Sequence, residues 1–570
     1  MNRAATLRTR ARAVALRVLV ATFVLGACAQ SVGAQAIRTA ADSAFHVMNR
    51  LAFGPRPGDV DRVARTGVLR WVESQLAGLD DAALKARESE FELLRYDSDE
   101  LARAVREAQR RRRERQRARA EAGDGERDMQ GVPGDSKSMD ASDTKEKGED
   151  PDMGNMRELR GQLAQIAVVR AVESQNQLRE VMVDFWFNHF NVFHAKGADR
   201  YLLPAYVEQV IRPHALGRFE DLLIATAQSP AMLFYLDNVQ SVAAGAVPPL
   251  MLRAQERAER GTLPEKRLEQ LERAQQRMPK GLNENYAREL LELHTLGVDG
   301  GYTQTDVVEV ARIFTGWHMQ RPNQGTEFEF RVWAHDRGRK EVLGVVFPAG
   351  GGREEGIRLL RLLANHPATM RHVAGKIATR LVGDVPPDDC IDAAVDAWKR
   401  SGGDLREIVR AIVQTPEFWS PRYVRSKFKS PLEYVVSAVR AVDGRVDNTP
   451  RLSRVVAQLG QPLYLQAVPT GYPETADAWV SSGSLLQRMN VAVALASGNL
   501  KGVQVDLEPL VSVTDAEALV DELDVRLLGG TMSANTRRVI LEQIRRVRKQ
   551  PQRLALAVGL TLGGPEFQRQ

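Results

Sequence analysis

Residues 281–317 constrain the fold of this chain more than any other segment. They read GLNENYARELLELHTLGVDGGYTQTDVVEVARIFTGW, which holds start and stop signals for two helices. Asn283 is a good N-cap and Gly297 a natural C-cap for the first helix, and Thr303 opens the second with a capping-box pattern. The first helix places three carboxylates, two amide side chains and a histidine in or beside an apolar face. Polar groups in a core cost free energy unless they are partnered, so this helix predicts a functional site.

Two carboxylates give that helix its candidate chemistry. Glu289 and Glu292 are i, i+3 neighbours, so they share a face of the helix. Such a pair can hold a divalent cation, or one member can raise the pKa of the other for acid–base work. The structural alternative is a solvated face on which Arg288 pairs with Glu284 and Glu292.

A second helix, within residues 178–194, carries further polar groups. In VMVDFWFNHFNVFH the apolar side chains point in nearly every direction around the axis, which predicts a buried helix. Asp184 and Asn188 lie one turn apart on one face, and His189 lies on the adjoining face. A buried aspartate needs a cation, a cluster of donors or a metal as its partner. His189 is a metal ligand in one interpretation and a hydrogen-bonded core histidine in the other.

An adjacent His335-Asp336 pair supplies two more candidate ligands. It lies in a predicted turn, where Asp336 can instead bond its own backbone. We expect the polar residues of these three regions to converge on one pocket around a divalent metal. The metal would polarise a bond, and one carboxylate would act as general base. The candidate catalytic residues are Glu289, Glu292 and His189, and the candidate metal ligands are Asp184, His189, Glu289, His335 and Asp336.

The N-terminus predicts export. Five arginines and no acidic residue accompany an apolar run at 18–27 that is too short to span a bilayer. Cleavage after Ala36 would release the chain, whereas Cys28 in the lipobox-like LGAC would carry a lipid and give the only membrane attachment that we expect. Without residues 1–36 the formal net charge falls from +6 to +1, because those five arginines are lost. A nucleic-acid partner is therefore not expected.

Cysteine content and missing motifs limit the chemistry further. Cys28 and Cys390 are the only cysteines, so processing leaves no pair for an intrachain disulfide. Cys390 is predicted to be a small buried residue at a helix start and not a nucleophile. The sequence has no HExxH zinc helix, no phosphate-binding P-loop and no GxSxG elbow.

Helical periodicity dominates the remaining chain. It predicts a mainly α protein, a multi-helical bundle-like array with one small β-hairpin or sheet. The hairpin is expected between 326–333 and 341–347, which alternate around the His335-Asp336 turn. Residues 101–122 are a charged helix candidate that runs into a stretch without aromatic residues or periodicity. The expected parts are a signal peptide at 1–36, an N-terminal helical part at 41–100, a charged disordered insert at 104–156, core helices at 157–240, a charged helical insert at 241–280, a central core with the hairpin at 281–440 and a C-terminal helical part at 441–570.

Several motifs occur in an order that is typical of one protein family. They are RLAFGPRPGDVDRV, FWFNHFNVF, SPAMLFYLDN, the 281–317 segment, HDRGRKEVLG, KFKSPLEYVVSAVRAV and GQPLYLQAVPTGYPETADAWVSSGSLLQRMN. Together they resemble the bacterial domain-of-unknown-function 1800 family over residues 44–565, apart from the two inserts. The resemblance implies an exported, mostly helical protein and supplies no catalytic assignment. Family members often have histidine where this chain has Phe187, which argues against a two-histidine ligand scheme on that helix.

The resemblance also implies a partner. Genes of the family often lie beside those of a second exported family that looks like sulfatases and alkaline phosphatases. Two functions are therefore expected for an exported envelope protein. One is a metal-assisted hydrolase that acts on an extracellular substrate. The other is a non-catalytic scaffold or binding partner of the sulfatase- or phosphatase-like protein, in which the polar clusters are internal hydrogen-bond networks.

Overall fold

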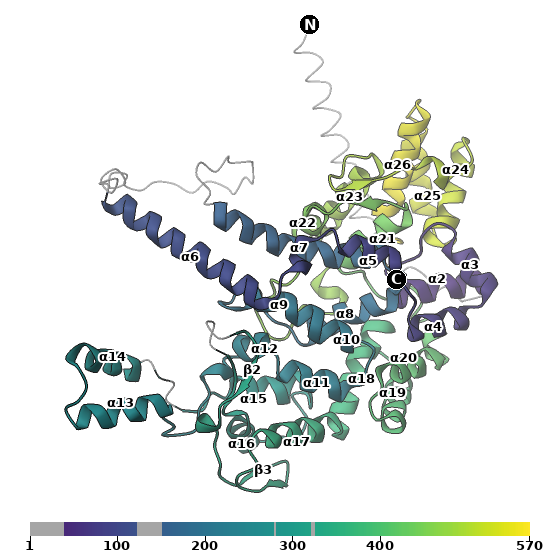
Figure 1. Ribbon diagram of the computed structural model, residues 1–570. Coiled ribbons are helices and arrows are strands. Elements are labelled where there is room, and N and C mark those ends of the chain that lie inside the picture. The colour runs from purple at the N-terminus through teal and green to yellow at the C-terminus, as the bar shows by residue number, and fades with distance from the viewer. Residues whose placement is uncertain (1–38, 122–150, 277, 279–280, 321–324) are drawn as a thin grey trace.

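The computed structural model describes residues 39–121, 151–276, 278, 281–320 and 325–570. These residues form a mainly helical protein with three small antiparallel sheets, which confirms the predicted fold class (Figure 1). The predicted signal peptide, with Cys28 and Ala36, lies outside the described residues, as does most of the predicted disordered insert. None of the described helices combines the length and hydropathy that a bilayer span requires.

The N-terminal part surrounds one side of the core. It contains α2 (Ala40–Arg50), α3 (Asp59–Thr66), α4 (Val68–Ala77), α5 (Ala82–Glu88), η1 (Glu92–Arg95), α6 (Ser98–Glu121), α7 (Pro151–Glu173) and α8 (Gln177–His189). The charged helix that the sequence predicts is the outer half of α6, so residues 104–121 are helical. α8 is buried along most of its length, as its apolar pattern predicts, and the Trp186 indole N–H donates to the Ala215 carbonyl at 3.0 Å.

The middle of the chain adds short helices and one projecting arm. It contains α9 (Asp199–Ala205), η3 (Tyr206–Ile211), α10 (Arg212–His214), α11 (Phe219–Ala227), α12 (Pro230–Tyr235), η4 (Asn238–Gln240), α13 (Pro249–Glu259), α14 (Glu265–Gln276), α15 (Asn285–Glu289), η5 (Leu290–His294) and α16 (Gln304–Phe314). α13 and α14 form the predicted charged helical insert and project from the body (Figure 1). α16 begins with the predicted capping box between Thr303 and Asp306.

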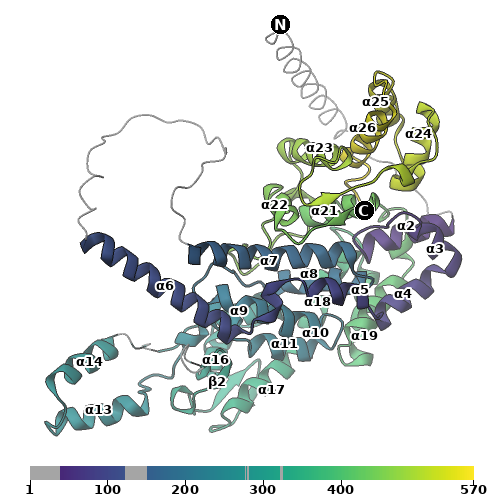
Figure 2. The same cartoon turned by 45° about the horizontal axis from the view of Figure 1, so that its top comes forward.

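The C-terminal half completes the body. Its helices are η6 (Val332–Ala334), α17 (Arg353–Ala364), α18 (Pro367–Leu381), α19 (Asp388–Ser401), α20 (Leu405–Gln414), η7 (Glu417–Trp419), α21 (Pro431–Ala441), α22 (Arg451–Gln458), η8 (Ala476–Ala478), α23 (Ser482–Ala496), η9 (Glu508–Leu510), α24 (Ala516–Leu523), η10 (Asp524–Leu528), α25 (Ala534–Ile544) and α26 (Gln550–Gly563). α23 packs on α26 in a C-terminal group of helices, whereas α7, α8 and α18 lie within the body (Figure 2). Cys390 is buried near the start of α19, as predicted.

The strand pairing differs from the predicted hairpin. β1 (Trp317–Met319) pairs with β2 (Phe328–Phe330), β3 (Lys340–Val342) with β4 (Val345–Phe347), and β5 (Arg445–Val446) with β6 (Val503–Gln504). The prediction that 326–333 pairs with 341–347 is therefore wrong. Leu343 and Gly344 both have positive φ, at 51° and 74°, so they form a tight turn that closes β3 on β4 and leaves β2 to pair with the strand that follows α16.

Candidate functional site: the Arg380 pocket

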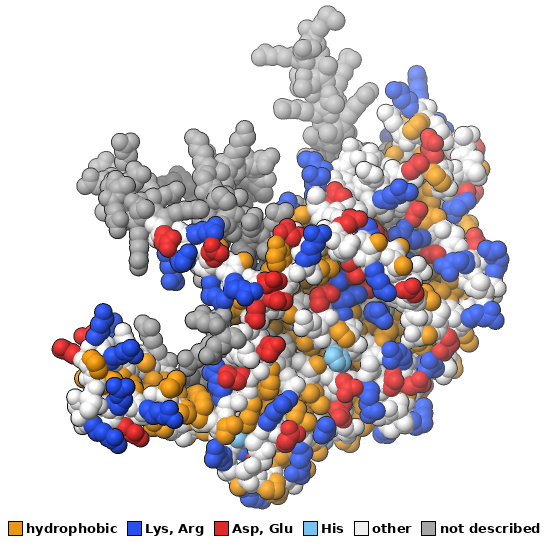
Figure 3. Space-filling view, in the orientation of Figure 1, with side chains coloured by type: hydrophobic (Ala, Val, Ile, Leu, Met, Phe, Trp, Pro, Cys, Tyr) orange, Lys and Arg blue, Asp and Glu red, His pale blue; other side chains and the backbone are white. Residues whose placement is uncertain are grey.

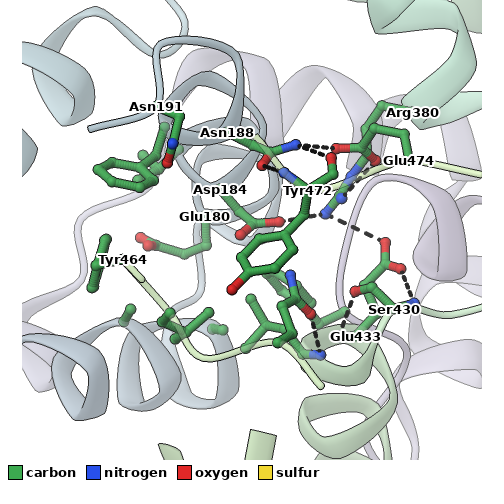
Figure 4. Close-up of a pocket in the computed structure, with 18 of the residues that line it drawn as sticks. Glu180, Asp184, Asn188, Asn191, Arg380, Ser430, Glu433, Tyr464, Tyr472 and Glu474 are labelled. Carbon is green, nitrogen blue, oxygen red and sulfur yellow. Dashed lines mark hydrogen bonds and ion pairs between the residues drawn. The ribbon is translucent and has the colours of Figure 1, made fainter. Parts of the chain in front are cut away.

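A cavity lies between α8, α18, α21 and the loop at 461–479. Its empty volume, including the part open to solvent, is about 920 Å³. Figure 4 shows that Asp184, Glu433 and Glu474, which come from different elements, point toward Arg380. We call this cavity the Arg380 pocket. The residues that carry its chemistry are Glu180, Asp184, Phe187, Asn188, Asn191, Arg380, Glu433, Tyr464, Tyr472, Glu474 and Trp479.

Arg380 is the centre of a buried ion network. Its Nη2 lies 2.9 Å from Asp184 Oδ2 and 3.3 Å from Glu433 Oε1, and its Nη1 lies 3.1 Å from Glu474 Oε2. Burial opposes the charge of this guanidinium, but Glu433, Glu474 and Asp184 outweigh that cost and raise its pKa. The predicted buried aspartate thus has a cation as its partner, supplied by a helix far away in the sequence.

Two carboxylates on the same Nη2 atom have opposite pKa shifts. Burial raises the pKa of Asp184 to about 6, and Arg380 only partly offsets this because Glu474 and Glu433 lie nearby. Glu433 is also buried, yet Arg380, the Gln570 amide and the Ser430 backbone N–H lower its pKa to about 2. Environments that separate the pKa values of neighbouring carboxyl groups are typical of acid–base sites.

Asn188 joins the 461–479 loop to α8. Its Nδ2 donates to the Tyr472 carbonyl at 2.8 Å, and its Oδ1 accepts from the Tyr472 backbone N–H at 2.6 Å. Gly471 is required beside it, since a Cβ there would lie 2.3 Å from the Asn188 carbonyl oxygen. Asn191 adds bonds from Nδ2 to the carbonyls of Gln466 and Val468 at 2.9 and 2.8 Å. These amides fix one wall of the pocket.

Tyr464 stands in that wall with a strained backbone. Its φ is 65°, a left-handed conformation that is unusual for a bulky side chain and is found mainly where surrounding contacts enforce it. The His194 backbone N–H donates to the Tyr464 carbonyl at 3.0 Å, and the Tyr464 ring meets the edge of Phe187 at 4.7 Å. Tyr464 lines the pocket, burial raises the pKa of its hydroxyl, and the hydroxyl has no hydrogen-bond partner among the described residues.

Glu289 and Glu292 do not belong to this pocket. Both are half-buried, and burial followed by the charge of Glu292 raises the pKa of Glu289. The predicted regular helix is interrupted there, because α15 ends at Glu289 and a π-helical turn, η5, follows. Arg288 pairs with Glu284 at 3.2 Å, as the structural alternative predicts. A catalytic role for the two glutamates stays a prediction.

His189 is buried behind the pocket among aromatic rings. Its Nε2 lies 3.2 Å from the His294 carbonyl, and its ring packs against Phe185, Trp186 and Phe190. Burial, and then the charge of Lys376, hold its pKa well below the usual value. The imidazole is therefore neutral at pH 7. Its catalytic role also stays a prediction, whereas the alternative of a hydrogen-bonded core histidine describes its contacts.

His335 and Asp336 belong to a separate ion network, which we call the Lys340 cluster. Asp336 accepts from Arg312 Nε at 2.9 Å and from the Gly338 backbone N–H at 2.8 Å, so it bonds its own turn as one alternative predicts. Lys340 Nζ lies 2.7 Å from Glu355 Oε2. The nitrogen His335 Nδ1 lies 2.9 Å from the Thr315 carbonyl, and burial lowers the pKa of the ring.

The predicted metal centre is therefore not assembled. Asp184 binds Arg380, His189 lies beside His294, Glu289 stands on α15, and His335 with Asp336 lies in the Lys340 cluster. Across the described ranges, no group of three His, Cys, Asp or Glu side chains is placed to hold a metal ion. The two aspartates have arginine partners, Arg380 and Arg312, so the structure does not gather these residues into one set, and metal binding by them stays a prediction.

Sequence reasoning missed Arg380, Glu433 and Glu474. An arginine in the apolar run IATRLV, and a glutamate in SPLEYVV, are charges in helices that read as buried. Each one signals a need for a partner. Their mutual pairing spans distant parts of the chain and has no local spacing that would predict it.

Comparisons with known proteins identify a family. A family model described as "Protein of unknown function (DUF1800)" matches residues 46–569. No curated protein and no solved structure gives a match. The match covers the Arg380 pocket and the Lys340 cluster alike.

Proposed function

The chain belongs to the DUF1800 family, and we propose that it is an exported hydrolase that cleaves an ester bond of a polar extracellular substrate in the Arg380 pocket. One observation carries this proposal. Asp184 has a pKa of about 6 and shares a guanidinium with Glu433, whose pKa is about 2. A general base is most effective when its pKa lies near the working pH, which suits Asp184.

The proposed reaction uses three groups. The Asp184 carboxylate takes a proton from a water molecule, whose oxygen forms the new bond to the acyl carbon. The Tyr464 hydroxyl donates a hydrogen bond to the carbonyl oxygen as negative charge develops on it. The C–O bond to the leaving alkoxide then breaks, and the alkoxide takes the proton from Asp184. The products are a carboxylic acid and an alcohol. No step passes through a divalent metal, because the predicted ligands do not fit one.

Replacement of Asp184 tests the reaction. Asp184→Asn keeps the shape of the side chain and removes the base, so kcat/KM for soluble acetate esters such as glyceryl triacetate should fall roughly 10²–10⁴-fold. The matched control is Asp443→Asn, which changes an exposed carboxylate paired with Arg56. Equal activity in wild type and Asp184→Asn would overturn the proposal, as would a wild-type chain that hydrolyses no ester of the panel.

Export is part of the proposal and rests on the N-terminal sequence. Five arginines, an apolar run and the alternatives Cys28 and Ala36 support it. Mass spectrometry of the protein recovered from its native cell fractions tests it. An N-terminus after Ala36 indicates release, an acylated Cys28 indicates a lipid anchor, and an intact Met1 in a cytoplasmic fraction would contradict export.

A second function, a non-catalytic binding partner of a co-exported sulfatase- or phosphatase-like protein, is favoured by the arm. The arm consists of α13 and α14 and projects from the body. It exposes Leu250 and Leu252, which are 73% and 45% accessible. Apolar side chains on a projecting element are typical of contact surfaces. Leu250→Ser with Leu252→Ser should abolish co-purification of that protein, whereas retention would remove the arm from the interface.

A further inference from the structure

We infer that the Arg380 pocket binds a neutral carbohydrate, so that the ester cleaved in the proposed reaction is carried by an acylated glycan. The ester part rests on the proposed function, whereas the binding of a neutral sugar rests on the pocket alone. The charge balance of the wall, the position of its aromatic rings and the acceptors that remain open lead to this ligand class.

Charge balance disfavours an anionic ligand. Each arginine of the wall is already paired, since Arg212 forms two bonds of 2.8 and 2.9 Å with Glu180, and Arg170 forms bonds with Glu208 and Glu88. Arg380 has three carboxylate partners. Among the described lining residues, no cation remains available for a phosphate, a sulfate or a carboxylate group. A ligand anion would also face four lining carboxylates, which repel it.

The same pairing disfavours a cationic ligand. An amine would need a carboxylate whose charge is not already balanced, and Glu180, Asp184, Glu433 and Glu474 each have an arginine partner. The amine would also lie close to buried guanidinium groups, where repulsion is screened less than at the surface. A neutral ligand avoids both costs.

Aromatic rings and an open acceptor line the same pocket. Tyr464, Tyr472 and Trp479 stand on the loop, with the rings of Tyr472 and Trp479 5.9 Å apart, and Phe187 stands on α8 beside Tyr464. Asp184, on α8, uses only Oδ2 for Arg380, so Oδ1 is available to accept a hydroxyl proton. Figure 4 shows Asp184 and Tyr472 facing the same space.

A sugar ring matches this combination of groups. It presents apolar C–H groups that pack on aromatic faces and hydroxyls that both donate to carboxylates and accept from tyrosine. The Tyr464 hydroxyl, which has no partner among the described residues, supplies such a donor. A pocket that is largely apolar, with a few convergent polar groups, is the usual form of a small-molecule site. The neutral polyhydroxylated ring is thus the ligand that uses both the aromatic rings and the open acceptor.

Calorimetry on the full chain tests the ligand class directly. Titrations of wild type with cellotriose, xylotriose and N-acetylated chitotriose, none of which carries an ester bond, measure neutral sugars without turnover, and trigalacturonate is the anionic comparison. At least one neutral trisaccharide should bind roughly tenfold or more tightly than trigalacturonate, because like-charge contacts are costly in the pocket. Binding by wild type of trigalacturonate alone, or of no trisaccharide, would overturn the inference.

A charge variant sharpens the test. Glu474→Gln removes one partner of Arg380 and should let the pocket accept trigalacturonate, with at least roughly tenfold tighter binding than in wild type. The matched control is Glu73→Gln on α4, which removes an exposed partner of Arg410. It should change the affinity for neither the neutral trisaccharides nor trigalacturonate. No gain of anion binding in a folded Glu474→Gln variant would show that charge balance does not select the ligand.

Failure of the inference and failure of the proposed function give different results. Neutral trisaccharides that bind wild type while their acetylated forms are not hydrolysed would support the ligand class and contradict the hydrolase. Hydrolysis of glyceryl triacetate that depends on Asp184, without binding of any neutral trisaccharide, would support the hydrolase and contradict the ligand class. Faster hydrolysis of acetylated xylotriose than of glyceryl triacetate by wild type supports both.

Discussion

Arg380 and Lys340 are both cations buried among carboxylates, yet their surroundings differ. Lys340 is fully buried, bonds the Gly338 carbonyl at 3.1 Å and pairs with Glu355 at 2.7 Å. Its neighbour Asp336 has a pKa lowered chiefly by the bonds from Arg312. Arg380 borders a pocket whose empty volume, including the part open to solvent, is about 920 Å³, and one of its partners, Asp184, has a pKa raised to about 6. Figure 3 shows that charges of both signs are interspersed over the face in view.

The comparison teaches what distinguishes a site from a structural ion pair. Both clusters hold distant elements together, and breaking either leaves an uncompensated buried charge. Only the Arg380 pocket combines open space with a carboxyl group whose charged form is disfavoured. The largest predicted effects concern the property that the clusters share, and the smaller ones concern the property that separates them.

Arg380→Ala should have the largest effect on stability. Three carboxylates would lose their common cation, two of them in largely buried positions, so the free energy of unfolding should fall by about 5 kcal/mol. Urea unfolding followed by circular dichroism measures the change. Arg410→Ala is the control, since Arg410 pairs with Glu73 and Glu407 near the surface and its loss should cost about 1 kcal/mol or less. Equal losses in the two variants would contradict a buried network.

Lys340→Ala should come next and should separate the two clusters. It leaves Glu355 buried without its closest cation and should lower the free energy of unfolding by about 3 kcal/mol. Ester hydrolysis per folded molecule should not change, because Lys340 lies outside the Arg380 pocket. Residual activity at a temperature where the variant is folded measures this. A loss of activity as large as that of Asp184→Asn would place the site in both clusters.

Asp184→Asn should combine lost activity with a small gain in stability near pH 7. The native carboxyl group holds its proton more tightly than the unfolded one, since burial raises its pKa from 3.8 to about 6. Its stabilising contribution is complete below about pH 4 and is lost as the pH rises through about 6. The amide lacks this cost, so the variant should be more stable by about 1 kcal/mol at pH 7 and equal to wild type near pH 4. Urea midpoints at both pH values measure this difference in stability, and the opposite order would contradict the raised pKa.

In wild type, kcat/KM should rise with pH through about 6 and then level off.

Glu289→Gln should have the smallest effect. Glu289 is half-buried, and its nearest charges are the repelling Glu292 and the attracting Arg288. The change in the free energy of unfolding should stay within about 0.5 kcal/mol, and ester hydrolysis should be unchanged. A drop in activity comparable to that of Asp184→Asn would return this glutamate to the catalytic role that the sequence suggests.

Local signals in the sequence predict the helices well, and they fail where tertiary contacts decide. The capping box at Thr303 and the buried α8 both follow from short-range patterns. The π-helical turn after Glu289 has no such pattern, because one extra residue per turn is not visible in hydrophobic spacing. The predicted strand pairing is wrong because β2 has a strand before it and a strand after it in the sequence. Alternation of apolar and polar residues does not decide which of these two strands is its partner.

The candidate site was predictable by half. Asp184 and Asn188 were identified on one face of a buried helix, and both line the pocket. The sequence does not identify Arg380, Glu433 and Glu474 as site residues. Arg380 lies 196 residues along the chain from Asp184, 53 from Glu433 and 94 from Glu474, and only folding brings these residues together. A buried charge announces in sequence that it needs a partner but not which one.

The way in which the loop is attached to α8 has an evolutionary consequence. Asn188 and Asn191 hold the loop through hydrogen bonds to main-chain groups of Tyr472, Gln466 and Val468. Most of this attachment therefore does not depend on which side chains the loop carries. Homologous chains that keep the two asparagines and Gly471 can exchange the aromatic residues at 464, 472 and 479 while the loop keeps the same backbone conformation. Changes in ligand preference within the family would then be concentrated in this loop, and a survey of natural variants should find the highest sequence variation at these three positions.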